Sequence, residues 1–331
     1  MSVKGRLVPA KHGREQMPLK GKGFDRMDDE VTYTASMDGK IEMQNDRIVV
    51  LPVHEVSGNA ELAEGNIDFR GDIVIHGNVE SGVNIRATGS ITIDGVAEAC
   101  MLEAGKDIIL RGGMLGGNKA SVKTKGAITA KFFEFTNILC EGDLQADVLM
   151  DCSVICHGQI RLTGRKGSII GGKVQAIRGL IATSLGNDAE KRTEIFVGAG
   201  IDVYSRLRVM EKKIETTREE LAKIEEGLEK FEILSKERGV SYTNDPRRTS
   251  LLRIKIKDSA MLASDEEEVR KLRILAESSR GACVSVIQEI YPGVIINMDE
   301  LKLALKNMAT GVEFYKLPDK IGTRPCSAGV E

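Results

Sequence analysis

Apolar residues recur through the middle of the chain at a spacing that neither a single helix nor a single strand produces. One apolar residue per repeat serves as an anchor, and successive anchors lie 16 to 20 residues apart: Ile73, Ile91, Ile108, Ile128, Leu144, Ile160 and Leu180. A branched apolar residue stands six positions before every anchor, and a small residue stands four positions before six of the seven. With a further apolar residue at +2, the positions −6, −4, 0 and +2 alternate as they do in β-strands.

Glycine separates the two alternating pairs in most repeats. It stands two positions before the anchor in five of the seven repeats, as Gly71, Gly89, Gly126, Gly142 and Gly158. At such a corner glycine can adopt a positive φ, and it brings no Cβ that would clash with the next repeat. A unit of about 18 residues cannot bury its apolar row alone, so the repeats must stack. The pattern predicts a parallel β-helix of seven or eight coils.

Two other solenoid classes do not fit this spacing. Hexapeptide coils need an aliphatic residue at every sixth position, which the −6, −4, 0, +2 alternation does not supply. Calcium-binding nonapeptide coils need aspartate within a glycine-rich run, and the run from Gly112 to Asn118 contains none.

The apolar period becomes helical after residue 203. The apolar seam of this segment has alternating spacings of three and four, through Leu207, Met210, Ile214, Thr217, Leu221, Ile224, Leu228 and Phe231. We expect the helix to end at Gly239 and a second one to start around Asn244-Asp245-Pro246. A weaker seam follows, through Leu251, Ile254, Asp258, Met261, Asp265, Val269, Leu272 and Leu275. Together they predict an antiparallel coiled-coil hairpin.

Strand alternation returns after the hairpin, at Val284 and Val286, and continues beyond a Tyr291-Pro292-Gly293 turn. The chain is therefore predicted to be mainly β with an α-helical insertion. We divide it into five parts: a basic, loosely ordered lead-in (1–30), a β-helix with an N-terminal cap (31–203), the hairpin (204–281), return strands that complete the β-helix (282–317), and a tail (318–331).

Three runs carry a resemblance to a known family. The stretches GNIDFRGDIVIHG (65–77) and GRKGSIIGGKVQA (164–176), with the heptads after TEIFVG (193–198), resemble the bacterial flagellar assembly protein A family over about residues 20–317. The resemblance implies a right-handed β-helix with an inserted coiled coil. It also implies cytoplasmic proteins that act through protein partners in flagellar assembly or placement at the cell pole. Family members usually carry a further N-terminal domain, and we expect this chain to begin after it.

Charge and composition agree with a cytoplasmic protein. Lys+Arg 47 against Asp+Glu 49 gives a net charge of −2, which is no global argument for nucleic acid or an anionic membrane. The sequence lacks both an apolar run long enough to span a membrane and a secretory signal, and its six cysteines form no CxxC motif. With 35 glycines and no tryptophan, the composition suits narrow repeated units.

The glycine-rich stretch 164–174 contains the candidate anion contacts. Gly167 to Lys173 fits the outline of a phosphate loop, but Val174 replaces the required Ser or Thr, and a strand is expected where a helix should follow. Gly164-Arg165-Lys166-Gly167 has the outline of an RNA-binding GXXG clamp without its flanking helices. Arg165, Lys166 and Lys173 are therefore possible anion contacts, and the alternative is a basic surface corner.

We expect no catalytic, cofactor-binding or metal site. Cys140 and Cys156 occupy one apolar column, where small core residues are the simplest interpretation. The four histidines are scattered and form no metal-binding motif. Aspartates such as Asp72, Asp107 and Asp143 flank the corners, but the loops beside them are too short for the cleft of a sugar-cleaving β-helix.

Two functions of different classes follow. The preferred one is a non-enzymatic scaffold that positions partner proteins, in flagellar assembly or at the cell pole. The alternative is a module that binds anions or nucleic acid through the basic segment 1–30 and the Arg165/Lys166 corner; we do not expect nucleic acid as the main partner. Because two aspartates interrupt the second seam, we predict a homodimer through the first. That interface would comprise Leu207, Met210, Ile214, Leu221, Ile224, Leu228 and Phe231. The alternative is that the return helix covers these residues.

Overall fold

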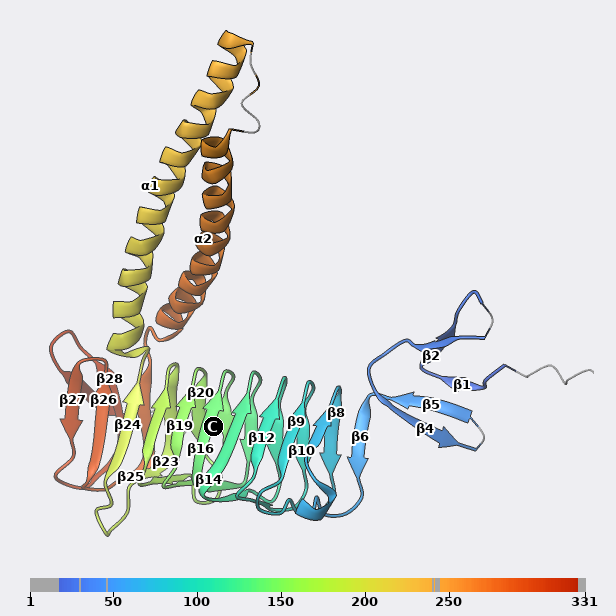
Figure 1. Cartoon of the computed structure of the whole chain (residues 1–331). Helices are drawn as coiled ribbons and strands as arrows, with labels where there is room; N and C mark the ends of the chain where they lie inside the picture. Colours follow the sequence, from blue (N-terminus) through green and yellow to red (C-terminus); the bar gives the residue numbers. More distant parts are fainter. Residues whose placement is uncertain (1–17, 30, 46, 240, 242–244, 327–331) are drawn as a thin grey trace, which may run out of the picture.

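A computed structural model describes residues 18–29, 31–45, 47–239, 241 and 245–326 of the chain. It contains a rod of stacked β-coils, from which a helical hairpin projects near the C-terminal end (Figure 1). Small β-sheets lie beyond the first coil at the other end of the rod. The parallel β-solenoid has about eight turns and two inserted helices, as the sequence predicted.

The segment before the rod forms two small sheets of its own. One sheet has the order β1-β5-β4 and the other pairs β2 with β3. Their strands are β1 (Gly21–Lys22), β2 (Phe24–Arg26), β3 (Tyr33–Ala35), β4 (Lys40–Gln44) and β5 (Arg47–Leu51). The solenoid itself starts at Val53, inside the segment 31–203 that was predicted to hold an N-terminal cap and the β-helix. Residues 18–29 of the predicted lead-in include strands, whereas residues 1–17 lie outside the described part of the chain.

Each coil contributes strands to three faces of the rod. The face with the −6 and −4 columns comprises β7 (Ile67–Phe69), β9 (Asn84–Ala87), β12 (Met101–Ala104), the ends of β14 (Met114–Thr124) and β16 (Phe132–Cys140), β19 (Ser153–Cys156), β22 (Lys173–Ala176), β24 (Thr193–Val197) and β26 (Val294–Met298). The face with the anchors comprises β6 (Val53–Val56), β8 (Asp72–Ile75), β10 (Ile91–Ile93), β13 (Ile108–Leu110), β15 (Ile128–Ala130), β17 (Leu144–Gln145), β20 (Gln159–Leu162) and the starts of β23 (Gly179–Leu185) and β25 (Cys283–Ile290).

A third face completes each coil, and the column analysis did not anticipate it. Short strands and the remaining parts of the long ones form this face. It comprises β11 (Ala97–Glu98), the starts of β14 and β16, β18 (Val148–Met150), β21 (Ser168–Ile170) and the ends of β23 and β25. A short 3-10 helix, η1 (Leu62–Glu64), lies in the first coil.

The predicted register is confirmed residue by residue. Ile91 pairs with Ile73 on one side and with Ile108 on the other, and the same parallel pairing continues to Leu180. All seven anchors are fully buried. Because each anchor is covered only by the anchors above and below it and by the facing strands, the core is a continuous column along the rod.

The corner glycines are required by close packing and not, in general, by their backbone angles. Among the five corner glycines only Gly71 has a positive φ, so that part of the prediction was wrong for the others. A Cβ placed on Gly142 would lie 2.6 Å from the Gly126 carbonyl oxygen, and one on Gly158 would meet the Gly142 carbonyl. Successive corners stack so closely that no side chain fits between them.

The C-terminal end of the rod closes with antiparallel strands. β25 and β26 continue the parallel stack, whereas β27 (Leu301–Ala304), β28 (Ala309–Lys316) and β29 (Ile321–Pro325) pair antiparallel. The predicted return strands are therefore present, and β29 lies in the segment predicted as a tail. An antiparallel cover of this kind satisfies part of the edge that a parallel stack leaves open.

The strand register can be tested with two neighbouring isoleucines. Ile108 is fully buried, whereas Ile109 is 37% exposed on the outside of the same strand. Ile108→Asp buries an uncompensated carboxylate and should cost more than about 4 kcal/mol of unfolding free energy. Ile109→Asp should cost no more than about 1 kcal/mol. Equal losses for the two variants, measured by chemical denaturation, would contradict the assigned faces.

Candidate functional site: the helical hairpin and the glycine corners

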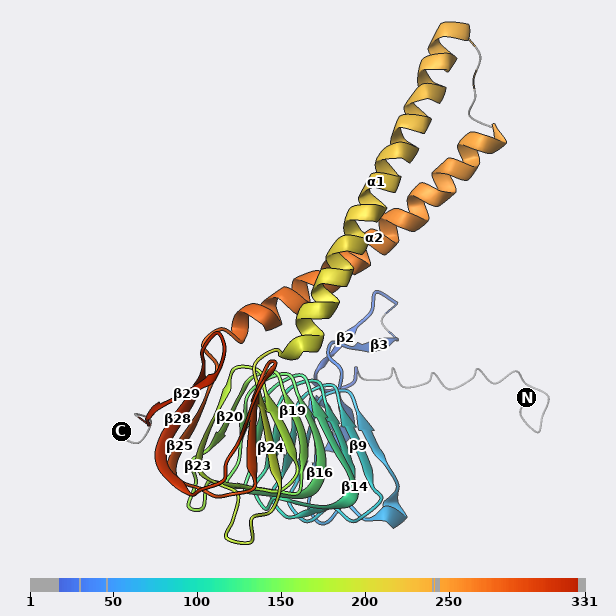
Figure 2. The ribbon, with the colours of Figure 1, turned by 90° about the vertical axis from the view of Figure 1, so that its left-hand side faces the viewer.

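The hairpin is inserted at one corner of the solenoid. In the preceding coil, β22 and β23 are joined by a two-residue corner, Ile177-Arg178. In the next coil, residues 198–282 occupy the corresponding place between β24 and β25. They contain α1 (Gly200–Arg238) and α2 (Pro246–Ser278), which rise from the corner edge of the rod (Figures 1 and 2). The predicted hairpin, 204–281, matches these helices to within a few residues.

The ends of both helices follow from their sequences. Gly239 ends α1 in the left-handed conformation, with φ 62°, as predicted. Asp245 caps α2 by accepting a hydrogen bond from the Arg247 amide (2.8 Å), and Pro246 occupies the first turn. Asn244 of the predicted turn lies outside the described residues. Where the hairpin joins the rod, Gly198, Gly200 and Gly281 have positive φ values.

The predicted α1 seam lies against α2. Ile214 and Leu221 are buried, with exposed fractions of 7% and 9%, and Thr217 lies buried between them. The other seam residues are half-buried: Leu207, Met210, Ile224, Leu228 and Phe231. The return helix of the same chain therefore covers the middle of the seam, which is the alternative to a homodimer that the sequence analysis left open. Homodimerisation through these residues stays a prediction.

The return helix follows the predicted seam except at two positions. Ile254 and Met261 were expected in the seam, but they are 42% and 39% exposed. Asp265 is buried in the seam beside Val269 and Leu272, and it forms an ion pair with Lys213 of α1 (Oδ2–Nζ 2.7 Å). The lysine supplies the countercharge that a buried carboxylate needs, so the aspartate does not require a partner chain.

Further ion pairs join the flanks of the two helices. Glu211 pairs with Arg273 (2.6 Å) and Arg218 with Glu266 (2.5 Å). Two more pairs are Glu225–Lys255, at 2.8 Å, and Arg206–Glu268. The sequence analysis missed these contacts. The sequence did contain a usable signal, because in the first three pairs the two residues lie at similar distances along the chain from the turn. Exposed pairs of this kind contribute little individually, but they fix the register of the hairpin.

The corner of Arg165 and Lys166 already holds an anionic group of the protein itself. The Lys166 and Gly167 amides both donate to Asp147 Oδ1, at 2.7 and 2.8 Å. An aspartate of the preceding coil therefore occupies the backbone donors that an anion would use. The Arg165 and Lys166 side chains are exposed around this corner.

Lys173 lies apart from that corner, at the start of β22. Its ammonium group stands over the ring of Phe196, 4.6 Å from the ring centroid. A strand follows Gly171 and Gly172, so the helix that a phosphate loop requires is absent from this described segment. The structure does not bring Lys173 together with Arg165 and Lys166 into one phosphate-binding loop.

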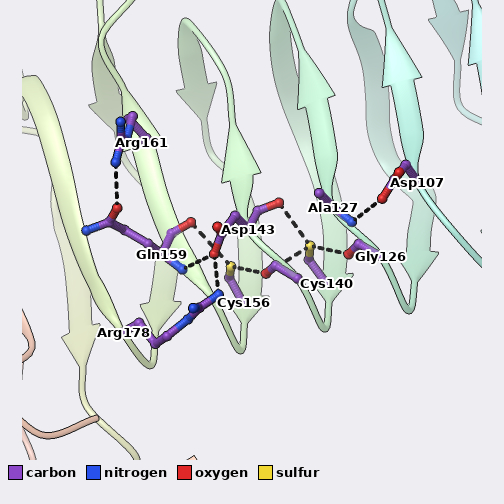
Figure 3. Close-up of polar contacts among 10 residues, drawn as sticks. Asp107, Gly126, Ala127, Cys140, Asp143, Cys156, Gln159, Arg161 and Arg178 are labelled. Atoms are coloured by element: carbon purple, nitrogen blue, oxygen red, sulfur yellow. Dashed lines mark hydrogen bonds and ion pairs between the residues drawn. The ribbon is translucent and has the colours of Figure 1, made fainter. Parts of the chain in front are cut away.

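Aspartates at the other corners accept hydrogen bonds from backbone amides of the next coil. Asp107 Oδ1 accepts from the Ala127 amide (2.7 Å), and Asp143 Oδ1 accepts from the Gln159 amide (2.8 Å) and from Arg178 (2.6 Å) (Figure 3). Asp72 Oδ1 accepts from the Ser90 amide in the same way. These carboxylates are thus engaged in coil-to-coil contacts.

The thiols of the core are packed inside the rod. Cys140 and Cys156 are paired neighbours in adjacent coils, both fully buried, and their Sγ atoms lie 3.3 and 3.2 Å from the Gly126 and Gly142 carbonyl oxygens (Figure 3). Burial raises the pKa of Cys100 to about 12 and that of Cys152 to about 11. At neutral pH such thiols are poor nucleophiles and poor metal ligands. Among the described residues, no cluster of three or more His, Cys, Asp or Glu side chains could hold a metal ion.

The occupied corner yields a prediction for Asp147. Asp147→Ala frees two backbone amides and should lower the unfolding free energy by about 1–3 kcal/mol, whereas Asp68→Ala, at an exposed strand position, should change it by less than about 0.5 kcal/mol. With Asp147 present, millimolar phosphate or ATP should leave the melting temperature unchanged. Stabilisation by several degrees that Lys166→Ala abolishes would contradict our assignment of this corner.

Comparison with known proteins agrees with this architecture. The model of the Flagellar Assembly Protein A beta solenoid domain matches residues 52–321, from the first solenoid strand to the start of β29. That domain family is not a known enzyme family. Searches of curated proteins and of solved structures gave no match. None of the described helices is both long and apolar enough to cross a membrane. Because the family match covers most of the chain, this protein belongs to the flagellar assembly protein A family.

Proposed function

We propose that the protein is a non-enzymatic scaffold of flagellar assembly, in which a rigid β-rod presents the helical hairpin to partner proteins. The main support for the proposal is that the hairpin is inserted at a corner without interrupting the stack of coils. Beneath it the stack continues in register, with Leu180 paired to Val284 although 103 residues separate them in the sequence. The rod therefore does not need the hairpin in order to bury its core.

The rod has the properties of a support. Its core is one continuous apolar column, and its corner carboxylates cross-link successive coils through backbone amides. Such a structure resists bending because each coil is hydrogen-bonded along its length to both neighbours. We place partner recognition on the hairpin because it is the part of the chain that projects away from this support (Figure 2).

The anion-binding alternative has less support. Asp147 occupies the two amides of the Arg165/Lys166 corner, and Lys173 stands over Phe196. The basic side chains of residues 1–17 lie outside the described part of the chain. We therefore assign flagellar partners to this protein, and we place it in the cytoplasm near the cell pole as part of the same proposal.

Replacing residues 199–281 by a short glycine-serine linker tests the scaffold function. The preceding coil closes with a short corner, so the shortened chain should keep its cooperative unfolding and its β circular dichroism. In a flagellated bacterium that lacks its own copy of the gene, the shortened chain should restore swimming no better than an empty vector.

A variant with Arg165→Ala and Lys166→Ala is the matched control for this experiment, and it should restore swimming like the parent. Full restoration by the shortened chain, provided that it is expressed at the parental level, would refute the scaffold role of the hairpin. Loss of swimming in the double variant alone would favour the anion-binding alternative.

A further inference from the structure

A groove lies along one side of the hairpin, between α1 and α2. Figure 2 shows that the two helices spread apart toward the rod. The volume of the groove is about 980 Å³, and it is formed by residues of 211–219 in α1 and of 266–277 in α2. The lining positions on each helix recur at spacings of three and four residues, so each helix contributes one face. The groove is therefore a surface of the hairpin itself, and it borders the seam between the helices.

The floor of the groove is apolar and incompletely covered. Ile214 and Val269, which are buried at the helix contact, line it. Ile274 stands beside them and is 58% exposed, although it is a large aliphatic residue in a helix. A third apolar surface laid on this floor would remove the Ile274 side chain from water and gain roughly 1–2 kcal/mol.

The rim of the groove carries uncompensated negative charge. The three lining arginines are each tied to a glutamate: Arg218 to Glu266, Arg270 to Glu267, and Arg273 to Glu211. By contrast, Glu215, Glu219 and Glu277 line the groove without an ion pair to any described residue. The groove therefore offers free carboxylates and no free guanidinium group among its described residues.

The dimensions of the groove suit one more helix. Its α2 side extends from Glu266 to Glu277, which corresponds to about 16 Å, or three turns, along the helix axis. A helix laid between two diverging helices contacts both through positions i, i+3, i+4 and i+7. An extended strand would find no open backbone edge here, because both walls are helical.

We propose that this groove binds an amphipathic helix of a partner protein, with an apolar stripe on Ile214, Val269 and Ile274 and with Lys or Arg residues facing Glu215, Glu219 and Glu277. The proposal rests on the scaffold function above and specifies its partner. A second copy of this hairpin is not the occupant, because two identical grooves would bring their free carboxylates together.

The test uses the purified full chain and a fluorescent peptide of 18 residues. The peptide has leucine at helical spacings of three and four and lysine on both flanks of that stripe, and the comparison peptide has glutamate in place of every lysine. Anisotropy titrations should show that the lysine peptide binds at least about ten-fold more tightly than the glutamate peptide. Equal affinities for the two peptides would overturn the proposal.

Two isoleucines of α2 provide the matched protein variants. Ile274→Lys should weaken binding of the lysine peptide at least about ten-fold. Ile256→Lys, at a position that is 71% exposed and outside the groove, should leave it within about two-fold. Both variants keep a surface side chain on the same helix, and circular dichroism verifies their helix content. Equal effects of the two substitutions would overturn the proposal.

Light scattering tests whether a second copy of the chain, and not a partner helix, occupies the groove. A parent chain that dimerises at tens of micromolar and becomes monomeric on Ile274→Lys would assign the groove to a second copy and overturn the proposal. The peptide and light-scattering measurements test only the groove, so a negative result there would leave the scaffold function intact. Full restoration of swimming by the chain without the hairpin would instead refute the scaffold function itself.

Discussion

The in-register parallel pairing of successive coils is the constraint on which the rest of the molecule depends. A single coil has unpaired backbone groups along both of its edges and an apolar row that it cannot bury. Both needs are met by a neighbour with the same register, so Ile73, Ile91 and Ile108 must lie directly above one another. The same stacking brings the corners so close that a Cβ on Gly142 would strike the Gly126 carbonyl.

This constraint also determines where the chain can accept an insertion. Within a strand, one added residue would turn the apolar row outward in that coil. At a corner, added residues leave both flanking strands in place, and the hairpin uses this freedom between β24 and β25. The glycines at its base, Gly198, Gly200 and Gly281, let the chain leave the rod and return to it at adjacent points.

The two regular faces of the rod could be predicted because their columns have constant offsets from the anchor. The third face could not, because its buried residue stands six positions after Ile91 but five after Ile128 and nine after Ile160, as Ala97, Phe133 and Ile169. Loops of unequal length before this face erase the period, although the strands still pair. Pattern analysis finds a repeat only where the spacing is kept.

The hairpin was predicted as an element but not in its contacts. Heptad spacing identified the α1 seam correctly, whereas in α2 it selected Ile254 and Met261, which are exposed. From the spacing, Asp265 was expected to interrupt the apolar seam, but Lys213 of the other helix neutralises its charge. A contact between residues 52 positions apart is not visible in the period of either helix. The groove that we assign to a partner depends likewise on how α1 and α2 diverge, which is a property of the fold and not of one helix.

Distances between spin labels on the outward row of the anchor face test the continuous stack most directly. Thr92, Gln145 and Ile181 lie in this row, where three coil-to-coil steps lead from Thr92 to Gln145 and two more lead to Ile181. At about 4.8 Å per coil, the labels should be about 14 Å apart for 92–145, about 10 Å for 145–181 and about 24 Å for 92–181. The two shorter distances should thus add up to the longest. A 92–181 distance well beyond about 30 Å, or one shorter than that between 92 and 145, would contradict the single in-register stack.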